Sequence, residues 1–193
     1  MTRLGRWRNF VVLAGAVALM LASLTAATTP ADAASRLPSE KQWLRDVRVA
    51  MEGSGKYLNR KVEGKRKKFA INLDIDNSSL ATHYDTGAPI RRVLRFVRHA
   101  REHHVAILFN TARSGEQLKQ ARGQLEAAGY PVTQVCGRRA GETSDHSKRR
   151  CRRHFIAQGY TIIANVGNRP TDFSGKKNYG RAFRLPNYHL RLS

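Results

Sequence analysis

The sequence has few cysteines, few acidic residues and only one long apolar run. Its two cysteines, Cys136 and Cys151, are not spaced as Cys-x-x-Cys, and the histidines lack the spacing of metal ligands, so the chain makes a poor zinc site. After residue 33, no apolar run approaches the ~20 residues that cross a bilayer. The chain also has no internal repeat and no RNA-reading aromatic motif, which argues against a repeat array and against RNA recognition as the main function.

The excess of positive charge is extreme for a chain of this length. The 193 residues include 35 lysines and arginines against 14 aspartates and glutamates, a net charge of +21. Residues 1–33 contain three arginines and one aspartate, a net +2, so the remaining chain carries +19. Such a charge favours nucleic acid, acidic lipid, an anionic wall polymer or a phosphorylated substrate as partner. Non-specific polyanion binding beside another activity is therefore one interpretation of the charge, and plain solubility is the alternative.

Residues 1–33 have the three parts of a secretory signal peptide. Three arginines form a basic region, an apolar stretch of about 15 residues follows from Phe10, and Ala31-Asp32-Ala33 supplies small residues for cleavage. A membrane anchor is the alternative, but the apolar stretch is short for a span. We predict cleavage after Ala33, an exported protein, and no transmembrane segment in the mature chain.

The remaining residues, 34–193, are predicted to form a single domain in which strands and helices alternate. Apolar runs typical of buried strands alternate with amphipathic segments typical of helices. This alternation predicts a three-layer α/β/α sandwich around a mainly parallel, Rossmann-type sheet. The expected strands are 69–74, 105–109, 131–135, 160–166 and 182–185, and the expected helices are 39–57, 90–103, 116–128 and 147–158.

Two carboxylates follow the first of these strands. Asp74 and Asp76 are separated by one residue, so their side chains point to the same side at the end of the strand. Open α/β sheets bind ligands beyond the carboxyl ends of their strands, and two acids there indicate a metal, a covalent nucleophile or an acid/base pair. A solvated turn is the alternative, because Asp, Asn and Ser are common in turns.

Further polar residues follow other predicted strands. Thr111 follows the second strand, and Asn168 and Asp172 follow the fourth. Lys148 lies at the start of the helix that leads into the fourth strand. Parallel strands would bring all of them to one sheet edge. Each has a simpler alternative, since Thr111 and Asp172 can cap a helix or turn and Lys148 lies in a basic run.

Four motifs in this order resemble the haloacid dehalogenase (HAD) superfamily, and in particular its secreted, class B-like acid phosphatases of subfamily IIIB. They are Asp74-Ile75-Asp76, Phe109-Asn110-Thr111-Ala112-Arg113, Lys148 and Gly167-Asn168-Arg169-Pro170-Thr171-Asp172. The resemblance covers residues 39–193. It implies an Mg²⁺-dependent phosphomonoesterase that acts on a small phosphorylated substrate through an aspartyl-phosphate.

The resemblance also implies a role for each motif residue. Asp74 would attack phosphorus, and Asp76, with a raised pKa, would protonate the leaving oxygen and later activate water. Thr111 would hold a phosphoryl oxygen, and Lys148 would offset the crowded negative charge. Mg²⁺ would be bound by oxygen atoms from the first and last motifs. The implied metal set is Asp74, Asp76 through its carbonyl, Asn168 and Asp172, and Asn77 is an implied substrate contact. Arg113 and Tyr84 are further candidates for substrate binding because they lie in loops, with a solvated loop as the alternative.

The chain departs from the family pattern at Asn168, where the family usually has Asp. The amide still offers an oxygen but removes one negative charge, so we expect weaker metal binding or a larger role for Asp172. A similar motif with Asn occurs in lipin-type phosphatidate phosphatases. Asn at this position therefore need not mean inactivity. The lost charge still leaves an alternative function, that of a catalytically weak or inactive HAD-fold protein that binds phosphorylated or polyanionic ligands.

The two cysteines lie in a chain predicted to be exported. In oxidising compartments such pairs form disulfides, so we expect a bond between Cys136 and Cys151, with free thiols as the alternative.

Overall fold

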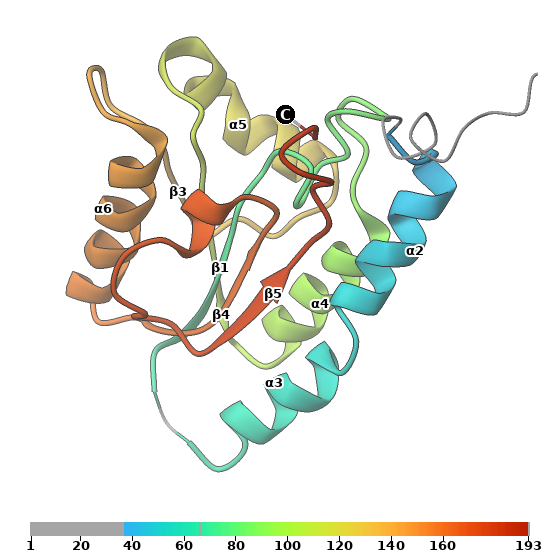
Figure 1. Cartoon of the computed structure of the whole chain (residues 1–193). Helices are drawn as coiled ribbons and strands as arrows, with labels where there is room; N and C mark the ends of the chain where they lie inside the picture. The colour runs from blue at the N-terminus through green and yellow to red at the C-terminus, as the bar shows by residue number, and fades with distance from the viewer. Residues whose placement is uncertain (1–36, 66, 193) are drawn as a thin grey trace, which may run out of the picture. The chain divides into compact units, whose positions relative to one another are not determined.

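The fold is that of the unit Leu37–Ser193, and the computed structural model describes residues 37–65 and 67–192 (Figure 1). The predicted signal peptide, residues 1–33, lies outside the described residues. Within the described part, no helix combines the length and the apolar character needed to span a bilayer.

Five parallel strands form the central sheet in the order β3-β2-β1-β4-β5. Every residue of β1 and β2 is buried, as expected for strands covered on both faces. The third strand begins later than predicted, because Pro131 has no N–H and the Thr133 hydroxyl accepts the Ile107 N–H at 2.9 Å. The strands are β1 (Phe69–Leu73), β2 (Ala106–Asn110), β3 (Gln134–Cys136), β4 (Thr161–Gly167) and β5 (Arg181–Arg184).

The predicted helix over 39–57 was wrong in its extent, because the chain forms two helices there. Ser39 caps the first and accepts a hydrogen bond from the Gln42 N–H. Gly53 then adopts φ +69°, a left-handed conformation that glycine tolerates, and the second helix starts after it. The described α-helices are α2 (Glu40–Ala50), α3 (Ser54–Val62), α4 (Arg91–Glu102), α5 (Gly115–Ala127) and α6 (Ser144–Ala157).

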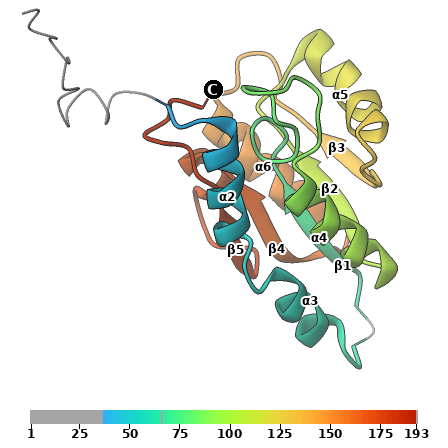
Figure 2. The same ribbon diagram turned by 90° about the vertical axis from the view of Figure 1, so that its right-hand side faces the viewer.

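The helices cover both faces of the sheet, which confirms the predicted three-layer sandwich. Helices α2 to α5 bury one face in a large core that includes Trp43, Ile71 and Phe109. Helix α6 covers the other face in a smaller core with Leu108, Cys151 and Phe155. Figure 1 shows α6 on the opposite side of the sheet from α2 and α4, and Figure 2 looks onto the face that α2, α3 and α4 cover.

The strand order fixes where a ligand site is expected. From β1 the chain adds β2 and β3 on one side, and it then returns to place β4 and β5 on the other side of β1. The crossovers therefore leave β1 and β4 in opposite directions, which opens a crevice at the carboxyl ends of these two strands. Asp74 directly follows β1, and Asn168 directly follows β4.

Candidate active site

A buried lysine joins two carboxylates at this crevice. The Lys148 Nζ lies 2.5 Å from Asp74 Oδ1 and 2.7 Å from Asp172 Oδ1, and it also donates to the Asn110 carbonyl at 2.5 Å. These contacts link α6 to the chain segments that follow β1 and β4. The side chains are at most 9 % exposed, so their charges interact with little screening by water.

Burial and charge shift the pKa values of this cluster. Burial, together with the negative charge of Asp172, raises the pKa of Asp74 to about 6 despite the neighbouring Lys148. For Lys148, burial alone would lower the pKa, but the charges of Asp172 and Asp74 outweigh it and raise the pKa above its usual range. The lysine therefore stays charged, and a further positive charge near Asp74 would favour the ionised form of this carboxyl.

Serine side chains after β1 position Asp74. Ser79 Oγ donates to the Asp74 carbonyl at 2.7 Å, and Ser78 Oγ donates to Asp74 Oδ2 at 2.8 Å. The same Ser78 hydroxyl lies 3.3 Å from Asn168 Oδ1. The Ser78 hydroxyl thus lies between a side-chain oxygen of Asp74, the residue after β1, and a side-chain oxygen of Asn168, the residue after β4.

Two buried amide groups in this region have no acceptor among the described residues. They are the Nδ2 atoms of Asn77 and Asn168. Asn77 Oδ1 accepts the His83 N–H at 2.8 Å, which leaves its Nδ2 as the unsatisfied donor. Buried donors without partners are rare in folded proteins. Acceptor oxygens of a bound ligand would satisfy them.

Asp76 differs from the prediction that its pKa is raised. Arg113 forms a two-point ion pair with it, with Nε 2.9 Å from Asp76 Oδ2 and Nη2 2.7 Å from Oδ1. Thr82 donates a further hydrogen bond at 2.9 Å. Burial acts to raise the pKa of Asp76, but the hydrogen bonds and charge of Arg113 outweigh it and lower the pKa. Asp76 is thus held in its ionised form.

Two other predicted residues have contacts within the protein. The Tyr84 ring stacks on Trp43 at 5.0 Å and its hydroxyl donates to the Pro38 carbonyl, so its substrate contact stays a prediction. Thr111 is fully buried, and its hydroxyl accepts the Arg113 N–H at 3.1 Å.

A cavity of about 360 Å³ opens over the acidic cluster. Five of the predicted site residues line it, while Thr111, Arg113 and Asn168 are not on its wall. Sequence reasoning missed Arg169 and Leu192 as wall residues. Arg169 could have been found from the sequence, because it lies within the motif Gly167–Asp172. Leu192 lies in no motif, and only the folding of the C-terminal segment brings it to the cavity. The wall consists of Asp74, Asp76, Asn77, Ala112, Ser144, Lys148, Arg169, Thr171, Asp172 and Leu192.

The oxygen atoms near Asp74 fit a hard divalent cation in part. No group of three or more His, Cys, Asp or Glu side chains in the described chain is arranged to hold a metal. However, Asp74 Oδ2 and Asn168 Oδ1 converge on the Ser78 hydroxyl, and such oxygens suit Mg²⁺. Asp172 already has protein partners on both oxygens, because Lys148 contacts one and the Arg169 N–H donates to the other at 2.8 Å, and its ligand role stays a prediction.

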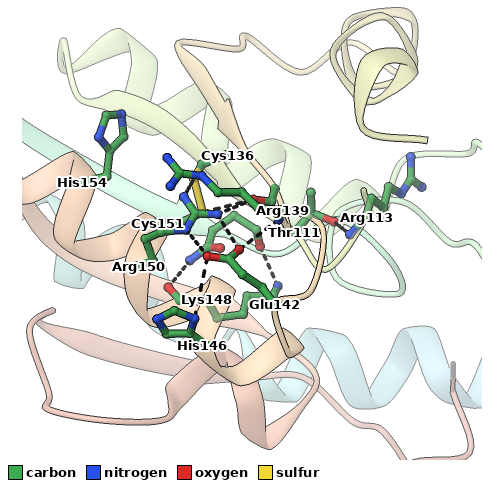
Figure 3. Close-up of a disulfide and its surroundings, with 12 residues drawn as sticks. Thr111, Arg113, Cys136, Arg139, Glu142, His146, Lys148, Arg150, Cys151 and His154 are labelled. Atoms are coloured by element: carbon green, nitrogen blue, oxygen red, sulfur yellow. Dashed lines mark hydrogen bonds and ion pairs between the residues drawn. A yellow bond between two sulfur atoms is a disulfide. The ribbon is translucent and has the colours of Figure 1, made fainter. Parts of the chain in front are cut away.

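A disulfide fastens the helix that carries Lys148 to the sheet (Figure 3). It joins Cys136, the last residue of β3, to Cys151, which lies three residues after Lys148 on α6. The Cys136 carbonyl also accepts the Thr111 N–H at 3.0 Å. The disulfide therefore connects the helix that carries Lys148 to the strand end that contacts Thr111.

An ion pair holds the loop between the cysteines. Arg150 Nε lies 2.6 Å from Glu142 Oε1, and Arg150 Nη2 donates to the Gly137 carbonyl at 2.7 Å. The hydrogen bonds from Arg150 and from the Arg139 N–H lower the pKa of Glu142 to about 2. This loop and the disulfide together brace the first half of α6.

Replacing both cysteines by serine should lower the free energy of unfolding by about 3 kcal/mol, because the bond closes a loop of 15 residues. Urea denaturation of the variant and of the oxidised wild type measures this difference. Wild-type protein unfolded with a reductant is the matched control and should behave like the variant. Equal stability of the variant and the oxidised wild type would show that the disulfide contributes nothing.

Comparisons with known proteins agree with this geometry. The family model described as "HAD superfamily, subfamily IIIB (Acid phosphatase)" matches residues 83–191. Two solved structures of the class C acid phosphatase from Bacillus anthracis, one with tungstate bound, are 16% identical and superpose with TM-scores of 0.61 and 0.59. Each match covers 77% of this chain and 79% of the other, and at this identity it shows the fold alone. No curated protein matches the sequence. Asp74 and Asp76 precede the matched residues, so their roles depend on the geometry above.

Proposed function

Because the chain belongs to the HAD superfamily, subfamily IIIB (acid phosphatase), and is thus a phosphomonoester hydrolase, we propose that it hydrolyses small phosphomonoesters with Mg²⁺ through an aspartyl-phosphate on Asp74. The observation that carries the proposal is the buried pairing of Asp74 with Lys148 at the carboxyl end of β1. A buried carboxylate next to a fixed cation is suited to attack an anionic phosphoryl group, because the cation offsets the repulsion between them.

In the first step an Asp74 carboxylate oxygen forms a bond to phosphorus, and the bond from phosphorus to the ester oxygen breaks. The leaving alkoxide takes a proton from Asp76 and departs as an alcohol. Lys148 stays charged and holds Asp74 in place while negative charge gathers on the phosphoryl oxygens. The free Nδ2 of Asn77 is a donor for one of those oxygens.

In the second step Asp76 accepts a proton from a water molecule whose oxygen attacks phosphorus. The bond between phosphorus and Asp74 then breaks, which releases inorganic phosphate and restores the carboxylate. The ion pair with Arg113 keeps Asp76 ionised, which is the form that accepts this proton. The same ion pair opposes protonation for the first step, so Asp76 must be protonated against its lowered pKa.

Asp74, Asn168 and the Asp76 carbonyl would hold the divalent cation. When bound, the cation would supply positive charge to the phosphoryl oxygens and to the ionised Asp74. Asp172 contributes indirectly, because its ion pair with Lys148 holds the lysine in position.

Replacing Asp74 by Asn should lower the turnover of a chromogenic phosphate ester by about 10⁴-fold or more, because the covalent route is lost. A chelator should abolish wild-type turnover, and added Mg²⁺ should restore it. Asp85→Asn is the matched control, since Asp85 is exposed and lies off the cavity wall. If the wild type shows no turnover with several divalent metals, the chain is a weak or inactive binder instead, and chelator-resistant turnover would remove the metal assignment alone.

Replacing Asn168 by Asp should tighten Mg²⁺ binding by about tenfold, because it adds one negative charge beside Asp74. In a chelator the same variant should melt at a lower temperature than the wild type, since the added carboxylate lies near Asp74 without a cation. Calorimetric titration and thermal melting measure both effects without turnover. Asn59→Asp on α3 is the control and should leave Mg²⁺ binding unchanged. Equal Mg²⁺ affinity of Asn168→Asp and wild type would contradict the ligand role of this position.

We also propose that the protein is exported and that the signal peptide is removed. The basic region, apolar stretch and small residues before residue 34 support this, as does a disulfide that suits oxidising compartments. Expression of the full chain in a secreting host should give extracellular protein whose mass corresponds to a start at Ala34. Protein that keeps residues 1–33 and sediments with membranes would indicate an anchor instead.

A further inference from the structure

Arg169 places a guanidinium group at the catalytic cavity that the proposed chemistry does not use. The residue lies between Asn168 and the short 3-10 helix Pro170–Phe173, and it lines the same cavity as Asp74 and Lys148. Its backbone N–H is occupied by Asp172, but its side chain is not held there.

The guanidinium is almost free of protein partners. It forms no ion pair with any carboxylate of the described residues, unlike the cavity's Lys148 and the neighbouring Arg113. Its side chain makes one hydrogen bond within this part of the chain, from Nη2 to the Leu192 carbonyl at 3.5 Å, the limit of such a bond. Since a guanidinium has five N–H donors, four have no acceptor among the residues that the structure describes.

The C-terminal segment fixes the wall beside this group. Asn187 Nδ2 donates to the Asn168 carbonyl at 2.9 Å, and Asn187 Oδ1 accepts the Leu192 N–H at 3.3 Å. Between them, three consecutive residues that are not glycine adopt left-handed φ angles, which backbone contacts must hold against strain. They are Tyr188, His189 and Leu190, and Figure 1 shows this segment beyond the end of β5.

The charges of the cavity wall around Arg169 are unevenly partnered. Leu192 lies beside Arg169 through its backbone carbonyl, while its side chain is fully buried in the large core. The acidic residues of the wall belong to the cluster around Lys148 and the ion pair with Arg113. A ligand that reaches Arg169 therefore finds a cation that no carboxylate of the described residues pairs with.

We propose that Arg169 binds a second anionic group, a carboxylate or another phosphate, on the leaving alcohol of the substrate. Phosphomonoesters of acidic alcohols are then better substrates than esters of neutral alcohols of the same size. This proposal rests on the proposed phosphatase function and names the substrate class of the same site.

The test compares two three-carbon esters, 3-phosphoglycerate and glycerol 1-phosphate, which differ by a carboxylate in place of a hydroxymethyl group. The wild type should show a kcat/KM at least about tenfold higher for 3-phosphoglycerate, since Arg–carboxylate hydrogen bonds are strong. Arg169→Gln should abolish this preference and leave glycerol 1-phosphate within about twofold of wild type. Arg169→Lys should keep part of the preference. Fructose 1,6-bisphosphate against fructose 6-phosphate repeats the comparison with a second phosphate.

Arg184→Gln is the matched control, because it removes the same charge from β5 at an exposed side chain that lies off the cavity wall. It should leave the preference intact. Equal kcat/KM for both esters in the wild type overturns the proposal, and so does an equal loss for both esters in Arg169→Gln, which would place the guanidinium on the transferred phosphoryl group. If the wild type hydrolyses neither ester, the proposed function fails, and calorimetric titration with the same esters still decides whether Arg169 selects the carboxylate.

Discussion

The buried ammonium group of Lys148 is the interaction on which the site depends. It lies between two buried carboxylates that follow different strands, and its charge offsets the cost of keeping their negative charges away from water. The lysine in turn needs a helix that cannot shift, and the disulfide and the Arg150–Glu142 ion pair hold that helix against β3. The disulfide and this ion pair, although far from Asp74 in the sequence, therefore help to keep the charge of Lys148 beside the two carboxylates.

The sequence predicted the parts of this arrangement that follow from local pattern. Buried apolar runs located the strands, and the order of the strands placed Asp74, Lys148 and Asp172 at one edge. It did not predict the lowered pKa of Asp76, because the responsible partner, Arg113, comes from a loop 37 residues away whose conformation depends on packing. For the same reason the sequence did not predict the stacking of Tyr84 on Trp43, which joins two segments with no shared pattern.

Only a few of the many basic side chains interact with groups inside the fold. Lys148 and Arg113 are tied to the acidic cluster, and Arg152 is buried on carbonyl oxygens, including that of Asp172. Most other basic side chains lie at the surface, where their interactions are weak and sensitive to salt. Polyanion binding stays a prediction of the composition, and it is separate from the chemistry of the cavity.

The cavity wall is built from two sources with different tolerance to change. The reacting groups follow the central strands, where each side chain is locked by buried partners. Leu192, in contrast, comes from the C-terminal segment, which Asn187 ties to the Asn168 carbonyl and Tyr188 ties to Asp46 of α2. None of the groups proposed for phosphoryl transfer belongs to this segment. A substitution there can therefore reshape the space offered to the leaving alcohol while it leaves the reacting groups in place.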